Sequence, residues 1–163
     1  MYVGLELVPD YDKPILANLL QLYLHDSTDF RDLELTRHGT YGYRWLDHYF
    51  TEPGREAYFI TVDDALAGFA LARNDVEPEG AWNISEFFVV RTHRRQGVGG
   101  IAAHALMVRH PGIWTLSFDH ANDPAARFWP GVTESVANGR VEWLEQRPPQ
   151  VDYPGTRLRF LVG

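Results

Sequence analysis

Cysteine is absent from the 163 residues of this sequence. Its absence excludes a thiol nucleophile, a disulfide bond and a thiolate metal site, and it fits a reducing cytosol. The seven histidines are scattered along the chain, and none shows a spacing typical of metal ligands. We therefore expect an intracellular protein that uses neither a metal ion nor a covalent cysteine intermediate.

Basic residues are also scarce, since 15 Lys and Arg stand against 22 Asp and Glu and give a formal net charge of −7. A general nucleic-acid binder needs a basic surface to displace phosphate counterions, so this class is excluded. No uncharged run approaches the ~20 residues that a membrane helix requires. Asp10 and Asp12 stand where a signal peptide would carry positive charge. These absences favour a soluble, cytoplasmic protein without a membrane partner.

The chain is long enough for one domain, and we expect residues 1–163 to form it. Alternation and helical periodicity, read with Pro and Gly as boundaries, predict seven strands and four helices. A loop is expected over 75–80. The order strand, two helices, three strands, helix, strand, helix, two strands indicates a three-layer α/β domain around a mixed sheet. The strands are expected at 2–8, 57–62, 66–73, 82–90, 113–118, 141–146 and 157–162, and the helices at 14–24, 43–50, 98–109 and from Pro124 onward.

The most informative segment is 94–100, which reads Arg94-Arg95-Gln96-Gly97-Val98-Gly99-Gly100 and joins an apolar strand to a helix. Its glycines allow the backbone to approach a ligand closely and to adopt conformations that other residues avoid. The amino terminus of a helix favours an anion, because its first N–H groups lack partners and the helix dipole is positive there. Two arginines add positive charge. The pattern predicts a pyrophosphate-binding loop.

Two other kinds of phosphate-binding loop do not fit this segment. A P-loop requires a lysine after its glycines, and a dinucleotide-binding loop would need its first glycine where Arg95 stands. A tight strand-to-helix turn without any ligand remains an alternative, and so does a loop that binds a phosphorylated nucleotide.

The same residues resemble the GNAT acetyltransferases. The family motif Q/R-x-x-G-x-G/A is matched by Arg94-x-x-Gly97-x-Gly99, and Glu86-Phe87-Phe88-Val89-Val90 is similar to its fourth strand. Asn122-x-x-Ala125-x-x-Phe128-Trp129 resembles the second motif. The match covers about residues 84–129, within an expected cofactor-binding core of about 82–130, and is similar to a poorly characterised group of small bacterial acetyltransferases.

The resemblance implies a GNAT fold, with a mixed, mostly antiparallel sheet flanked by helices, and acetyl-CoA as the cosubstrate. The backbone of Phe88, Val89 and Val90 would bind the pantetheine arm, and the N–H group of Val89 would bind the oxyanion. The second motif would flank the thiol. The complete implied cofactor set is Phe88, Val89, Val90, Arg94, Arg95, Gln96, Gly97, Val98, Gly99, Gly100, Asn122, Ala125, Phe128 and Trp129.

Two residues are candidates for proton transfer to and from the reacting amine. Glu86 precedes the apolar end of its strand and is the preferred general base, while His120 follows the 113–118 strand and could relay protons near neutral pH. Trp129 stands where the family often has a tyrosine that acts as the acid, and an indole has no proton to give near neutral pH. This departure favours the alternative of a non-catalytic acyl-CoA-binding sensor or protein-interaction module.

The acceptor is expected to be a primary amine of a small molecule or a peptide, acetylated by direct transfer in a ternary complex. Its predicted binding region lies between the first strand and the 57–73 hairpin, where acidic residues outnumber basic ones and aromatic residues could form a wall around an ammonium group. The oligomeric state, with a homodimer among the alternatives, is left open. The acidic residues are Asp26, Asp29, Asp32, Glu34, Asp47 and Glu52, and the aromatic ones are Tyr41, Tyr43, Trp45 and Tyr49.

Overall fold

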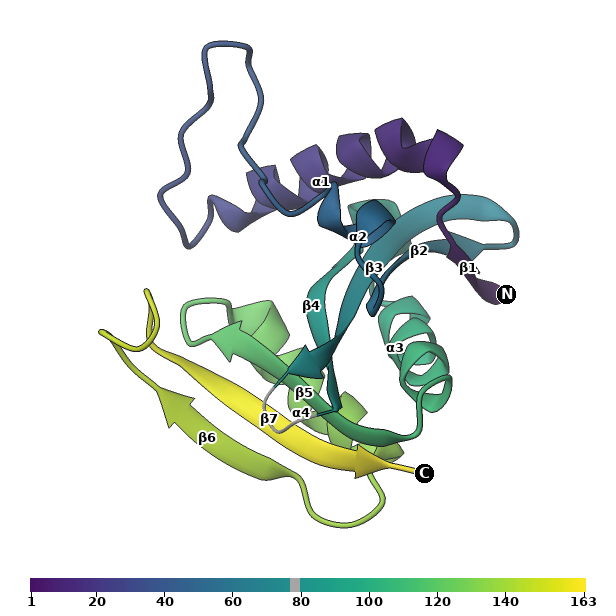
Figure 1. Cartoon of the computed structure of the whole chain (residues 1–163), viewed down its shortest axis with the longest axis vertical. Helices are drawn as coiled ribbons and strands as arrows, with labels where there is room; N and C mark the ends of the chain where they lie inside the picture. The colour runs from purple at the N-terminus through teal and green to yellow at the C-terminus, as the bar shows by residue number, and fades with distance from the viewer. Residues whose placement is uncertain (77–79) are drawn as a thin grey trace. The chain divides into compact units, whose positions relative to one another are not determined.

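The computed structural model describes residues 1–76 and 80–163 (Figure 1). None of the helices within these ranges is long and apolar enough to cross a bilayer. The helices and strands follow one another as β1 (Val3–Leu7), α1 (Lys13–Ser27), α2 (His48–Thr51), β2 (Arg55–Val62), β3 (Ala65–Val76), β4 (Ala81–Val89), α3 (Val98–Val108), β5 (Gly112–Asp119), α4 (Asp123–Val136), β6 (Glu142–Gln146) and β7 (Gly155–Val162).

The strands form one sheet in the order β1-β2-β3-β4-β5-β7-β6. Strands β1 and β2, β5 and β7, and β6 and β7 pair in antiparallel fashion, whereas β4 and β5 are parallel. The β4–β5 ladder is short and ends at the pair of Ile84 with Leu116, although both strands continue beyond it. The α/β class, the mixed, mostly antiparallel sheet and the order of elements along the chain are therefore confirmed.

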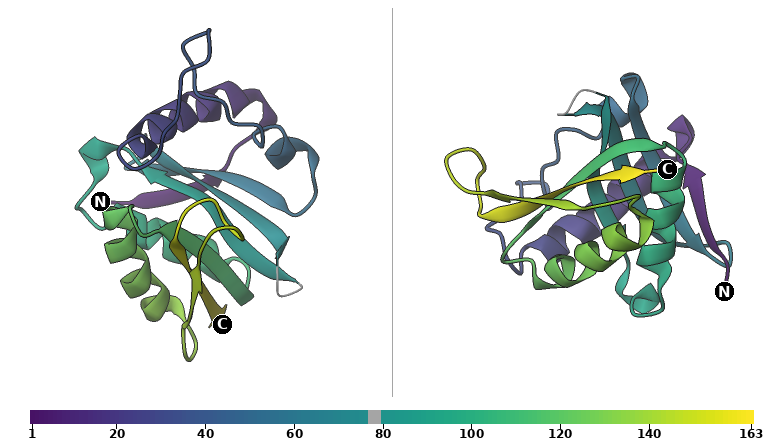
Figure 2. Two further views of the ribbon diagram at one scale, coloured as in Figure 1. Left: turned by 90° about the vertical axis from the view of Figure 1, so that its left-hand side faces the viewer. Right: turned by 90° about the horizontal axis from the view of Figure 1, so that it is seen from below.

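The structure divides into two compact units, and the first comprises Met1–Ala72 and Glu86–Gly99. In this unit α1 lies against strands β2 and β3 (Figures 1 and 2). Leu16 and Leu20 of α1 are almost completely buried there, and they meet Phe69 and Phe88 from the sheet. Burial of this apolar stripe stabilises the helix, since each large apolar side chain contributes roughly 1.5–3 kcal/mol when fully removed from water.

The β2–β3 hairpin turns at Asp63 and Asp64, whose φ angles of 49° and 68° both lie in the left-handed region. Two such residues in succession form the turn that matches the twist of paired strands, and aspartate tolerates this conformation better than most residues. The Asp63 carboxylate also accepts a hydrogen bond of 2.8 Å from the amide of Tyr2. This contact ties the start of β1 to the hairpin.

The second unit comprises Arg73–Ser85 and Gly100–Gly163. Its core contains Trp114, Leu116 and Leu158 from β5 and β7, all at most 1% exposed. Helix α4 contacts both of these strands. Gly155 of β7 is required by close packing, because a Cβ atom there would lie 2.6 Å from the carbonyl oxygen of Phe118.

The structure corrects several of the predicted boundaries. The helix expected at 43–50 is reduced to α2, His48–Thr51, because Tyr43 and Leu46 pack on the core from a non-helical segment. Strand β3 continues to Val76, beyond the expected end at residue 73, and into the predicted 75–80 loop. Residues 77–79 of that loop lie outside the described residues.

Candidate active site

The loop between β4 and α3 has the backbone geometry of a sharp turn. Arg95 and Gly97 adopt left-handed φ angles of 62° and 82°, and α3 begins immediately afterwards at Val98. A Cβ atom on Gly97 would meet nothing within 4 Å, so glycine is required there by conformation and not by space. The first amides of α3 have no carbonyl partner inside the helix, and an anion can bind them. Gln96 and Gly97 are solvent-exposed, which leaves this turn accessible to a ligand.

Arg94 is bound by other groups of the protein, and its expected role as a phosphate ligand stays a prediction. Its Nη2 atom lies 2.6 Å from Oδ2 of Asp26, and its Nε atom donates to the carbonyl oxygen of Val89 at 2.7 Å. The guanidinium also lies over the ring of Phe88, 5.5 Å from its centroid. Asp26 binds Arg91 as well, at 2.8 Å. Arg94 therefore fixes the loop to the ends of β4 and α1, and exposed Arg95 is left as the arginine best placed for a phosphate.

The end of β4 presents alternate backbone groups to opposite sides. The amide of Val90 donates to the carbonyl oxygen of Ala67 on β3 at 2.8 Å. Because neighbouring residues of a strand point their backbone groups in opposite directions, the amide of Val89 points away from β3. The Val89 carbonyl, which accepts from Arg94, points the same way. This arrangement suits the implied role of the Val89 N–H group, which needs to face a ligand and not a neighbouring strand.

Glu86 is a half-buried residue of β4 whose carboxylate accepts a hydrogen bond from Tyr23 of α1. Burial raises the pKa of Glu86 from 4.5 to about 7, against the opposing effects of the Tyr23 hydrogen bond and the positive charge of Arg31. A carboxyl group with this pKa exists in both protonation states near neutral pH. It can therefore take up and release a proton during a reaction.

Tyr23 is held in place by aromatic packing. Its ring contacts the rings of Phe69 and Phe88 edge-to-face, at centroid–centroid distances of 5.7 Å and 5.8 Å, respectively. Burial raises the pKa of Tyr23 well above 10.0, and the charge of Glu86 adds to the rise. The hydroxyl group stays protonated at neutral pH and remains a hydrogen-bond donor to the Glu86 carboxylate.

Tyr43 belongs to the same cluster. Burial also raises the pKa of Tyr43 strongly, with the charge of nearby Glu86 as the second cause, and its side chain is hydrogen-bonded to Tyr49. Sequence reasoning placed Tyr23 in the helix expected at 14–24 and Tyr43 in an aromatic wall, so it missed both as partners of Glu86. The available signal was a phenol hydroxyl within an apolar stripe, since buried tyrosine hydroxyls usually find a hydrogen-bond partner.

His120, in the second unit, is engaged by its neighbours. Its Nε2 atom lies 2.9 Å from Oε2 of Glu145 and 3.0 Å from the hydroxyl oxygen of Thr156. The Thr156 hydroxyl donates to the other Glu145 oxygen at 2.8 Å. The imidazole is thus oriented by residues of β6 and β7, and its part in proton transfer stays a prediction.

The second motif forms the start of α4. Asn122 is the N-cap, because its Oδ1 atom accepts a hydrogen bond of 3.3 Å from the amide of Ala125. Trp129 is only 7% exposed and meets the ring of Phe128 edge-on at 4.7 Å. The Asn-x-x-Ala spacing is therefore explained by the helix start itself.

Three of the six acidic residues of the expected acceptor region are paired with the protein's own cations, and the role of this region stays a prediction. Asp47 is paired with Lys13, and Glu52 binds Arg55 at 2.8 Å. Arg44 lies 4.4 Å from the ring centroid of Trp45. A substrate ammonium group would have to displace these internal cations in order to bind Asp47 or Glu52.

The predicted site residues are divided between the two units. Within the described part of the chain, no group of three His, Asp or Glu residues could hold a metal ion. Glu86, Phe88, Val89, Val90 and residues 94–99 belong to the first unit, whereas Gly100, His120, Asn122, Ala125, Phe128 and Trp129 belong to the second.

The model of the Acetyltransferase (GNAT) family matches residues 18–130. Since this match covers most of the chain and the fold agrees, the protein belongs to the GNAT family and is an acetyltransferase. No curated protein matches its sequence at a significant level.

Solved structures with similar folds include an acetyltransferase from Thermus thermophilus, with a TM-score of 0.70 and 16% identity over 99% of this chain and 98% of that one. The spermidine N-acetyltransferase of Vibrio cholerae, in complex with CoA and spermine, gives a TM-score of 0.64 at 10% identity and covers 98% and 95% of the two chains. NAA60 of Arabidopsis thaliana, in complex with a bisubstrate analogue, gives 0.63 at 13% identity and covers 99% of each. These identities establish a shared fold and no more.

Proposed function

We propose that this protein transfers the acetyl group of acetyl-CoA to a primary amine of a small molecule or peptide, by direct transfer in the cytoplasm. The observation that carries the proposal is the buried Glu86 carboxyl group, whose pKa of about 7 suits a general base. The lack of cysteine fits both direct transfer and a reducing compartment. The similar folds whose bound ligands are spermine and a bisubstrate analogue support an amine acceptor in general terms.

The residues of the β4–α3 loop fit the diphosphate of CoA. The amino terminus of α3 supplies amides, Gly97 supplies the required left-handed turn, and exposed Arg95 supplies charge. Arg94 contributes indirectly by holding the loop to Asp26 and the Val89 carbonyl oxygen.

Acetyl-CoA supplies the thioester, whose carbon–sulfur bond breaks as the amine nitrogen bonds to the acetyl carbon. Glu86, as the carboxylate, accepts the proton that the amine must lose, because an alkylamine has a pKa of about 10.4 and attacks only when neutral. The Val89 amide, which points away from β3, would hydrogen-bond the carbonyl oxygen as negative charge develops on it. Such a donor typically contributes about 10²–10³-fold in rate.

The departing thiolate also needs a proton, and Trp129 cannot supply one. The hydroxyl groups of Tyr43 and Tyr23 are poor donors, because burial and the charge of Glu86 raise their pKa values. Glu86, once it holds the proton taken from the amine, can pass this proton to the thiolate. A general acid contributes roughly 10²–10⁴-fold, and a thiol with a pKa of about 8.5 is already a tolerable leaving group. Loss of the family tyrosine is therefore compatible with turnover.

The test is a thiol-release assay with acetyl-CoA and a panel of amines that includes polyamines, amino acids and peptides with free amino termini or lysines. We expect at least one amine to be acetylated and Glu86→Gln to lower kcat by at least tenfold at neutral pH. Glu6→Gln, a matched change at an exposed position of β1, should leave the rate unaltered. Activity that is undiminished in Glu86→Gln would remove Glu86 as the base.

Trp129 favours one alternative, a non-catalytic acyl-CoA sensor or interaction module. That function predicts binding of CoA without thiol release for any amine in the panel. A nucleotide-binding function instead predicts that ATP protects the fold against heating better than CoA does. The assay and a thermal-shift comparison together separate the three functions.

A further inference from the structure

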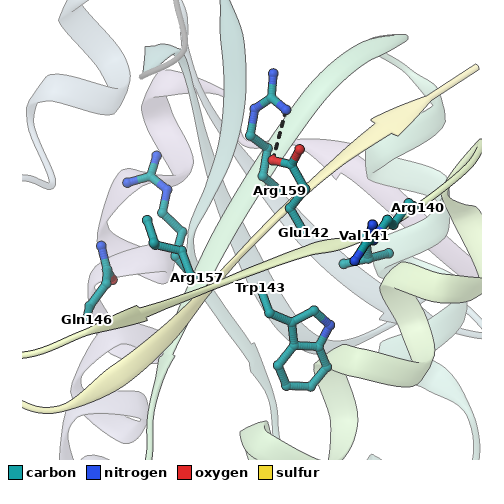
Figure 3. Close-up of a pocket in the computed structure, with 8 residues that line it drawn as sticks. Arg140, Val141, Glu142, Trp143, Gln146, Arg157 and Arg159 are labelled. Carbon is teal, nitrogen blue, oxygen red and sulfur yellow. Dashed lines mark hydrogen bonds and ion pairs between the residues drawn. The ribbon is translucent and has the colours of Figure 1, made fainter.

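Glu145 and Thr156 lie opposite each other on β6 and β7, and both belong to the second unit. Residues opposite each other in an antiparallel pair share a face, whereas neighbours along a strand alternate between faces. Figure 3 shows this alternation at the start of β6, where Glu142 and Trp143 point to opposite sides. Glu145 follows Trp143 by two residues and therefore lies on the same side as Trp143. Glu145 and Thr156 both contact the imidazole of His120, which directly follows β5.

The directions of these hydrogen bonds determine which nitrogen of His120 carries a hydrogen. A carboxylate only accepts, so the Thr156 hydroxyl group donates its single hydrogen to Oε1 of Glu145, at 2.8 Å. The Thr156 oxygen can then only accept from Nε2 of His120, at 3.0 Å, as can Oε2 of Glu145, at 2.9 Å. A lone pair on Nε2 would instead face two acceptors with no proton between them. Nε2 therefore carries the hydrogen, and the neutral imidazole has its lone pair on Nδ1.

Regular structure holds this network in place. Thr156 is only 3% exposed, and its strand pairs it with Phe118 of β5 as well as with Glu145 of β6. The amide of His120 donates to the carbonyl oxygen of Pro154 at 3.0 Å, which fixes the main chain of the histidine as well. The side chain of His120 is 44% exposed, so a reacting group can reach it. A histidine that transfers protons needs both an orienting partner on one ring nitrogen and this access.

We propose that Glu145 and Thr156 are positioning residues, which hold the hydrogen on Nε2 of His120 so that the imidazole exchanges a proton through Nδ1. This role rests on the proposed acetyl transfer, in which the amine loses one proton and the thiolate gains one. The lone pair of Nδ1 accepts a proton, and the N–H bond so formed releases it again, so the histidine returns to its starting form in each turnover. Nε2 keeps its hydrogen throughout. This route is additional to the one through Glu86, and the experiments below separate the two.

The first experiment is NMR of the full chain with ¹⁵N-labelled histidine at alkaline pH, where a histidine is neutral. The signals of His120 are assigned by their loss in His120→Gln. We expect the Nε2–H form, with a hydrogen that exchanges slowly with water in the wild type and faster in Glu145→Gln and Thr156→Val. Glu142→Gln, the same change on the opposite side of β6, should behave like the wild type. A predominant Nδ1–H form, or equal exchange in all four proteins, would overturn the proposal.

Kinetic measurements then separate proton transfer from a purely structural role. A glutamine can place an amide N–H group where Nε2 lies, so His120→Gln keeps a donor for Glu145 and Thr156 but cannot carry a proton. With any amine that the wild type acetylates, we expect His120→Gln to lower kcat at least tenfold and to leave the KM for acetyl-CoA unchanged. General acid–base catalysis contributes roughly 10²–10⁴-fold, which leaves room for this loss. Glu145→Gln and Thr156→Val should lower kcat by a smaller factor, and Glu142→Gln should not lower it.

The outcomes distinguish this inference from the proposed function. Full kcat in His120→Gln, together with a loss in Glu86→Gln, would overturn the role of His120 and leave the proposed acetyl transfer intact. A wild type that acetylates no amine would overturn both. Circular dichroism verifies that each variant is folded, and Thr156→Val, which keeps the shape of the side chain, tests the network should His120→Gln not fold.

Discussion

Tyr23 donates a hydrogen bond to Glu86, so a phenol that is fixed between Phe69 and Phe88 determines where a half-buried carboxylate lies. The bond stabilises the charged form of Glu86 and partly offsets the effect of burial. Both the position and the proton affinity of the proposed base thus depend on a residue from a different element of the fold.

Replacement of Tyr23 by phenylalanine keeps the ring packing and removes only the hydroxyl group. We expect the pKa of Glu86 to rise by about 0.5–1 unit, because a hydrogen bond to the charged form contributes roughly 0.5–1.5 kcal/mol. The acid limb of the pH–rate profile should move to higher pH by the same amount. ¹³C NMR of the Glu side chains measures the pKa of Glu86 directly and needs no amine substrate. Tyr11→Phe, at a side chain that is 83% exposed, is the control. An unmoved titration would show that the hydroxyl does not act on Glu86.

Glu86 should also make stability depend on pH. Its pKa of about 7 in the folded protein lies above the ordinary value of 4.5, so the folded state holds the proton more tightly than the unfolded chain. The resulting stabilisation is fully present below pH 4.5 and is lost as the pH rises through about 7. Relative to Glu86→Gln, the wild type should gain on the order of 3 kcal/mol between pH 8 and pH 4.5. Urea denaturation at several pH values measures this difference, and parallel curves for the two proteins would contradict it.

The two arginines of the β4–α3 loop should behave differently. Arg95→Gln should weaken CoA binding and flatten its salt dependence, because it removes the exposed charge that we propose binds the phosphates. Arg94→Gln should instead lower the free energy of unfolding of the free protein by about 1 kcal/mol, since it breaks partly exposed bonds to Asp26 and Val89. Titration of CoA at two salt concentrations, with thermal melts of the free variants, distinguishes the two roles. A loss of salt dependence in Arg94→Gln alone would reverse the assignment.

Gly68 allows β3 to lie close to the end of β4. A Cβ atom on it would lie 2.0 Å from the carbonyl oxygen of Phe88, a backbone atom that cannot move aside without distorting the strand. Gly68→Ala should therefore cost about 3 kcal/mol of stability or more, at the upper end of overpacking effects. Gly42→Ala, where a Cβ atom would meet nothing within 4 Å, is the matched control. Equal melting temperatures for the two variants would contradict the close approach.

Local signals were sufficient for much of the fold. The order of strands and helices was predictable because each depends on a short periodic pattern, and the Asn122 cap was predictable because its partner, Ala125, lies three residues away. The start of α3 after the glycines follows from the same kind of local rule. By contrast, α2 is shorter than expected, because tertiary packing of Tyr43 and Leu46 outweighs the helical pattern in that segment.

The partnerships at the candidate site were beyond sequence reasoning. Asp26 and Arg94 are separated by 68 residues, and no local pattern indicates that they meet. The composition of segment 26–52 indicates a surplus of negative charge. In the structure, however, Asp26, Asp47 and Glu52 are each paired with a basic residue.

Asp26 lies in the last turn of α1, where its negative charge meets the unfavourable end of the helix dipole, and its two carboxylate oxygens bind Arg91 and Arg94 separately. The side chain of Asp26 thus joins the end of α1 to the β4–α3 loop at two points. A movement of that helical turn would also move the loop. A ligand that reorders segment 28–47 would therefore alter the affinity for CoA, if the loop binds its diphosphate as proposed, and Asp26 would couple the two binding sites.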